Sequence, residues 1–244
     1  MMVCIGCQWH LRPADEETQS DVISIERYDR PEMLFLTTGD FAALQQLKTG
    51  YPTQTRMLIE DVLQLGQVDD PDINTRFLLF FQDSTLQALM ADVEREFGSL
   101  DDVSRQLSDA FGRLRTMLPG IETPVVYSQI GSLDQSIIVS SGQLGISLDK
   151  YLGSDYPLYL KYGYSEQQRE MMTRRFIVPD CLGFYLLSLY PPPADSLRSE
   201  QMVRIQYVVN RAMNERFFQH EGVARVEEMM KRHKDWTVEE MLKN

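Results

Sequence analysis

The stretch PVVYSQI, residues 124–130, decides the fold class, because the helical spacing of apolar residues before it gives way there to a β pattern. Two further stretches follow closely, QSIIVS at 135–140 and LGISLD at 144–149, and both are rich in β-branched residues. The connection 131–134 is typical of a short hairpin or a bulged turn, and the third stretch is expected to run beside the first two. A small sheet is therefore predicted in the middle of the chain.

Helical patterns surround this sheet in the sequence. Asp40 and Asp83 are suitable N-caps for two of the expected helices. The segment 22–28 alternates apolar and polar residues and is expected to be a strand. Apolar side chains repeat at helical spacing in 41–47, 57–65, 73–81, 86–97, 101–114, 179–189 and 196–218, with further helices near residue 166 and at the C-terminus. The expected fold is α+β, mostly helical with a small central sheet built from non-adjacent stretches.

Composition limits the functional classes. The chain has 244 residues, 43% of them hydrophobic, which is enough for one substantial core. Its 36 acidic and 24 basic residues give a net charge of -12, which disfavours binding to nucleic acid. No linker composition or internal repeat divides residues 22–244, so we expect one domain there, preceded by a polar tail over residues 1–21.

The N-terminus, MMVCIGC at residues 1–7, is similar to the end of a bacterial lipoprotein signal. Cys7 follows a small residue and is the expected lipid-attachment site. A full signal also has a basic start and an apolar run of ~7–15 residues, so either the start is truncated or the similarity is due to chance. Cys4 and Cys7 also form a C-x-x-C pair, although no second pair supports a zinc site. Cys181 is expected to be an inert buried thiol.

The stretch QHEGVAR at residues 219–225 nearly matches the HExxH zinc-protease motif. His220 and Glu221 supply the first pair, but Ala224 occupies the position of the second histidine, so one metal ligand is missing. A surface histidine is the simpler interpretation. A cryptic metal-dependent hydrolase that uses His220 and Glu221 is the alternative. No cofactor is expected.

The tyrosine-rich segment after the predicted sheet is the candidate binding surface. Tyrosine is amphipathic and suits contacts with a peptide or a sugar, although such clusters often only pack at the rim of a core. The carboxylates in this segment could equally cap turns or form ion pairs. The candidate surface residues are Asp149, Tyr151, Asp155, Tyr156 and Tyr159.

Several segments, taken in order, resemble the GldB gliding-motility lipoprotein family of Bacteroidota. They are IERYD at 25–29, YP at 51–52, FQD at 81–83, LGISLDKYLGSDYP at 144–157 and IVPD at 177–180. The fourth is the most specific. The resemblance extends from about residue 22 to residue 190, and the chain is expected to end earlier than family members do.

The resemblance implies a lipid-anchored protein of the cell envelope, at its periplasmic or outer-membrane face. The family is similar in architecture to predicted zinc peptidases of the zincin kind, and the helix expected at 196–218 takes the place of their metal-binding helix. That helix contains no histidine. The resemblance therefore implies a non-catalytic protein, attached to the membrane through its lipid anchor only. It would bind a protein or glycan partner in gliding motility, secretion or envelope maintenance.

Overall fold

The computed structural model describes residues 22–243, so the polar tail and Cys7 lie outside the described part of the chain. A four-stranded sheet forms its centre, in the order β1-β2-β4-β3. Strands β1, β2 and β4 are parallel, and β3 is antiparallel to β4. The strands are β1 (Ile25–Glu26), β2 (Val125–Gln129), β3 (Ile137–Ser140) and β4 (Gln143–Ser147).

The connection 131–134 is not a hairpin turn, which corrects the prediction. Strand β4 lies between β2 and β3, and the hairpin joins β3 to β4 through Ser141 and Gly142. Both residues have positive φ angles, 49° and 75°, which are the backbone conformation of a tight two-residue hairpin. Residues 131–134 instead form a loop whose backbone is bound by Asp149, as described below.

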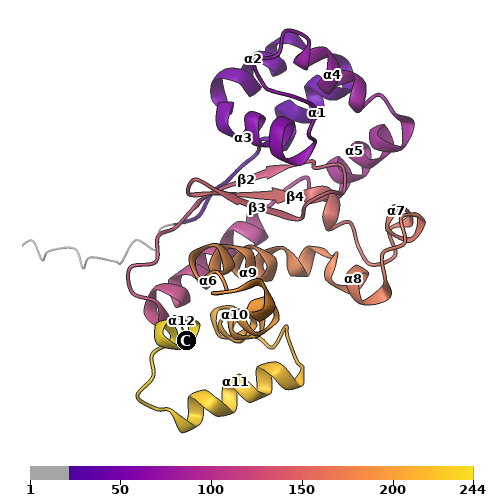
Figure 1. Cartoon of the computed structure of the whole chain (residues 1–244). Helices are drawn as coiled ribbons and strands as arrows, with labels where there is room; N and C mark the ends of the chain where they lie inside the picture. The colour runs from indigo at the N-terminus through magenta and orange to yellow at the C-terminus, as the bar shows by residue number, and fades with distance from the viewer. Residues whose placement is uncertain (1–21, 244) are drawn as a thin grey trace, which may run out of the picture.

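Helices lie on both sides of the sheet (Figure 1). Helices α1 to α4 form the indigo group on one side, while α6, α9 and α10 lie on the other side. The helices are α1 (Asp29–Thr38), α2 (Phe41–Gly50), α3 (Pro52–Arg56), α4 (Ile73–Phe80), α5 (Ser84–Glu96), α6 (Asp101–Met117), α7 (Pro157–Lys161), α8 (Glu166–Met171), α9 (Ile177–Leu189), α10 (Arg198–Met213), α11 (Glu221–Arg232) and α12 (Val238–Lys243). The predicted α+β class with a small central sheet is confirmed.

The predicted N-caps are also confirmed. Asp40 Oδ1 accepts a hydrogen bond from the N–H of Ala43 at 2.7 Å, and Asp83 Oδ1 accepts one from Thr85 at 2.8 Å. Helix α1 was not predicted, and the strand expected over 22–28 is reduced to β1. The helix expected over 57–65 is a π-helix at Met57–Val62 that continues α3, so the helical ladder widens there.

The helix expected over 196–218 is shorter, because α10 ends where Asn214 adopts a left-handed conformation with φ 54°. One cluster of buried apolar side chains extends from Ile23 to Leu242 and includes residues of the sheet and of the helices on both sides. The single domain and the zincin-like architecture stay predictions. Within residues 22–243, no helix combines the length and the apolar character needed to cross a membrane.

Candidate functional site

The segment LGISLDKYLGSDYP begins in β4 and then fixes the loop that follows β2. Asp149, in a single 3-10 turn after β4, accepts hydrogen bonds from the backbone N–H of Gly131 at 2.8 Å and of Leu133 at 2.5 Å. The parallel pairing of β2 with β4 places their carboxyl ends at the same edge of the sheet, so these groups meet. Asp149 is completely buried, and burial raises its pKa although the two N–H donors act in the opposite direction.

Lys150 holds the same loop from the other side. Its ammonium group donates to the carbonyl oxygen of Leu133 at 3.1 Å and to the hydroxyl of Tyr164 at 2.9 Å. The ammonium also lies 4.5 Å from the centre of the Tyr164 ring, close enough for a cation–π contact. The buried charge of Lys150 is therefore satisfied within the protein.

Tyr151 of the segment and Tyr159, which follows it in α7, point inward. The Tyr151 hydroxyl donates to Asp180 of α9 at 2.8 Å, and the Tyr159 hydroxyl donates to the carbonyl oxygen of Asp149 at 2.6 Å. Burial raises the pKa of Asp180 to about 7. Tyr156, which is half-buried, donates to Asp92 of α5 at 2.9 Å. The segment thus connects the sheet to α5, α7 and α9.

The predicted surface is corrected by these positions. Asp149, Tyr151 and Tyr159 have exposed fractions of 0%, 2% and 0%, so none of the three can contact a partner in this conformation. The side chain of Asp155 is fully exposed, with Arg169 3.9 Å away. Only Asp155 and part of Tyr156 belong to a surface, and a binding role for them stays a prediction.

Helices α7 and α8 project from the body on the side of this segment (Figure 1). Tyr159 of α7 and Met172, which follows α8, belong to a small separate apolar cluster together with Leu89 and Leu133. Leu160 of α7 and Tyr162 directly after it are large side chains that are 54% and 57% exposed. Sequence reasoning named the tyrosines of this region but had no signal for which of them would point outward.

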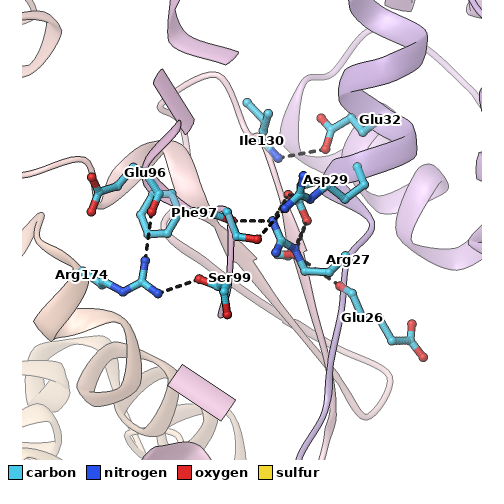
Figure 2. A network of polar contacts seen from close by, with 12 residues as sticks. Glu26, Arg27, Asp29, Glu32, Glu96, Phe97, Ser99, Ile130 and Arg174 are labelled. Carbon is cyan, nitrogen blue, oxygen red and sulfur yellow. Dashed lines mark hydrogen bonds and ion pairs between the residues drawn. The ribbon is translucent and has the colours of Figure 1, made fainter. Parts of the chain in front are cut away.

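The IERYD segment also stabilises the fold, through the hydrogen bonds of Arg27 and Asp29 (Figure 2). The Arg27 guanidinium donates to both oxygens of Asp29, at 2.8 and 2.7 Å, and to the carbonyl oxygen of Phe97 at 2.8 Å. Arg174, from the other side, donates to the carbonyl oxygen of Ser99 at 2.7 Å. Both arginines therefore bind the carbonyls at the carboxyl end of α5, where positive charge is favourable.

Glu32 of α1 is a buried carboxylate that sequence reasoning missed. One of its oxygens accepts the N–H of Ile130 at 2.9 Å, and the other has no hydrogen-bonding partner among the described residues. Burial, with Asp29 and Asp149 nearby, raises the pKa of Glu32 well above its ordinary value. No signal identified it, because α1 itself was not predicted.

The near-HExxH stretch has no metal-binding geometry. His220 precedes α11, is exposed, and lies 2.8 Å from the side-chain oxygen of Gln206 through Nε2. The Glu221 side chain is 95% exposed. Within residues 22–243, no three or more His, Cys, Asp or Glu side chains are grouped so that they could hold a metal ion. Cys181 is a buried free thiol, as expected.

The comparisons with known proteins identify the family. The family model described as gliding motility protein GldB matches residues 10–216, beyond the range that the sequence motifs covered. No curated protein and no solved structure matches the chain. The matched residues include the IERYD and LGISLDKYLGSDYP segments, while the near-HExxH stretch follows them and MMVCIGC at residues 1–7 precedes them. The chain belongs to the family of the gliding motility protein GldB.

Proposed function

We propose that this protein is a non-catalytic, lipid-anchored component of the cell envelope that binds a protein partner through the outer side of α7 and the residues that flank it. We call Asp155, Leu160 and Tyr162 the lobe surface. The exposure of Leu160 and Tyr162 at a helix that projects from the body (Figure 1) carries the proposal, because large apolar side chains in water gain free energy when another surface covers them.

Contacts on the inner side of α7 hold the lobe surface in place. Tyr159, on the inner side of α7, contacts the rings of Tyr156 and Tyr164 edge to face, with centroids 5.1 and 5.8 Å away. Its hydroxyl also accepts a hydrogen bond from the N–H of Leu152 at 3.0 Å. A preorganised apolar surface loses little conformational entropy on binding. The exposed side chain of Leu160 favours a protein partner over a glycan, because it offers no hydrogen-bonding group to a sugar hydroxyl.

The non-catalytic part of the proposal rests on how the chain uses its reactive side chains. Asp149, Lys150 and Asp29 are each satisfied by partners inside the protein, and all three hold loops or helix ends. The family name supports an association with gliding motility and an envelope location. Attachment through Cys7 rests on the sequence resemblance.

A photo-reactive amino acid at position 162, introduced in the host bacterium, tests the proposal. We expect a discrete cross-linked envelope protein with the probe at Tyr162 and none with the probe at Phe41, which is 74% exposed on α2. Leu160→Asp should abolish the cross-link and impair colony spreading, while Phe41→Asp should not. Cross-linking of the same protein from both positions, or normal spreading with Leu160→Asp, would contradict the proposal.

A further inference from the structure

A groove of about 800 Å³ lies between α10 and α11, far along the chain from the lobe surface. Helix α11 approaches α10 closely at one point, because a Cβ atom on Gly222 would lie only 3.0 Å from Val203 Cγ1. Beyond that point only Val223 and Val226 of α11 are buried. Figure 1 shows α11 at the edge of the molecule, with α10 on one side of it. The size of the groove is that of a ligand site.

Two aromatic side chains line the groove. Trp236 stacks on His233 with ring centroids 4.5 Å apart and planes 21° apart, which fixes the indole ring. Tyr207 is 9% exposed and accepts a hydrogen bond from Arg211 Nη1 at 3.2 Å. Because Tyr207 is buried and the Arg211 guanidinium lies over its ring at 5.7 Å from the centroid, Trp236 is the aromatic side chain that could pack against the apolar face of a sugar ring.

Most charged side chains that line the groove are paired with a side chain of opposite charge, and one basic side chain is not paired in this way among the described residues. Glu227 lies between Lys231 at 2.8 Å and Arg216 at 3.7 Å, so these three side chains satisfy one another. Glu215 is paired with Arg175. The contacts of Arg211 among the described residues are with Tyr207, through a hydrogen bond and a cation–π contact, and no carboxylate of that part of the chain pairs with it, although the protein carries a net charge of -12. A guanidinium group in this position can bind a ligand carboxylate through two parallel hydrogen bonds.

We propose that this groove binds an acidic saccharide, with Trp236 against the sugar ring and Arg211 on its carboxylate. Asn214, which ends α10 and is exposed, offers an amide to the ring hydroxyls. The residues that line the groove lie on both sides of residue 216, where the family match ends, and none of them belongs to the lobe surface. The site is therefore separate from the lobe surface and does not depend on its function.

Tryptophan fluorescence gives a direct measurement, because the chain has two tryptophans, Trp9 and Trp236. In a Trp9→Phe variant, titration with short oligomers of galacturonic, glucuronic or N-acetylmuramic acid should change the emission of Trp236. Neutral oligomers of the same length should bind at least tenfold more weakly. Calorimetry on the unsubstituted protein provides the corresponding affinity.

Two arginine variants distinguish this site from a general charge effect. Arg211→Gln should weaken binding of the acidic oligomer at least tenfold and leave the weak neutral binding unchanged. Arg204→Gln is the matched control, because Arg204 is on the same helix but lines a different hollow beside α11. Circular dichroism checks that both variants are folded. Failure of all three acidic oligomers to bind, equal binding of neutral ones, or equal losses in both variants would overturn the proposal.

Discussion

The carboxylate of Asp149 accepts a hydrogen bond from the backbone N–H of Leu133, which has a left-handed conformation with φ 64°. Ser132 before it is also left-handed, with φ 55°. Side chains other than glycine seldom adopt this conformation, and each such residue costs about 1–2 kcal/mol. The Asp149 carboxylate offsets this strain by satisfying the N–H groups that the turned loop directs inward.

Asp149→Asn should therefore destabilise the protein strongly. The amide keeps one acceptor but directs an NH₂ group toward the second backbone N–H, which leaves a buried donor unsatisfied. We expect a loss of about 2–4 kcal/mol in the free energy of unfolding, measured by urea denaturation. Asp155→Asn is the control, because its side chain is fully exposed, and it should change stability by less than about 0.5 kcal/mol. Similar effects of the two substitutions would contradict this account.

The sequence identifies Asp149 but not its role. Its neighbours in the chain mark it as part of a specific motif, whereas its partner Leu133 is 16 residues away and meets it only because β2 and β4 pair in parallel. A turn between two paired, successive strands is the usual expectation for residues 131–134. In the sheet, however, β4 lies between β2 and β3, so β2 and β3 are not paired and residues 131–134 do not form such a turn. Burial of the neighbouring tyrosines follows from the same packing.

Helix α1 could not be predicted for the same reason, because the contacts that hold it are with residues far away in the sequence. Its sequence, DRPEMLFLTT, has an apolar run rather than a clear helical spacing, and it has no side-chain N-cap. Asp29 and Glu32 are instead held by contacts with residues about a hundred positions away, Ser128 and Ile130. Capped helices with regular spacing, such as α2 and α5, could be predicted because their signals are local.

Gly145 provides a test of the parallel strand pair. A Cβ atom at this position would lie 2.5 Å from Cζ of Tyr127, its register partner on β2. Because the tyrosine is fully buried and cannot move aside, Gly145→Ala should lower the free energy of unfolding by about 1–3 kcal/mol. Thermal or urea denaturation measures the change.

Gly112 is the matched control for that substitution. It lies within α6, and a Cβ atom there would meet nothing within 4 Å. Gly112→Ala should stabilise the protein by about 0.5–1 kcal/mol, since alanine favours a helix interior. In a Tyr127→Ala background the cost of Gly145→Ala should largely disappear. A cost that persists there would mean that the clash with Tyr127 is not its cause.

His220→Ala tests the alternative of a cryptic metallohydrolase. The imidazole is exposed, and its hydrogen-bonding partner within residues 22–243 is Gln206, so we expect its removal to change neither zinc content nor colony spreading. Unfolding stability should change by less than about 0.5 kcal/mol. Zinc per protein molecule is measured in both proteins after the same purification. A loss of bound zinc in the variant would support the hydrolase instead.

The last prediction concerns pH, and it follows from the burial of the Asp180 carboxyl, which outweighs the opposite effect of the hydrogen bond from Tyr151 on its pKa. Burial raises the pKa of Asp180 to about 7, so the folded state holds a proton that the unfolded chain releases near pH 4. Stability from this group is present below pH 4 and is lost as the pH rises toward 7. Glu32 and Asp149 have pKa shifts in the same direction, so the wild-type curve alone does not isolate Asp180. The difference in unfolding free energy between wild type and Asp180→Asn, measured by urea denaturation from pH 4 to pH 8, should decline with rising pH. A difference that stays constant across this range would show that Asp180 is ionised in the folded protein throughout.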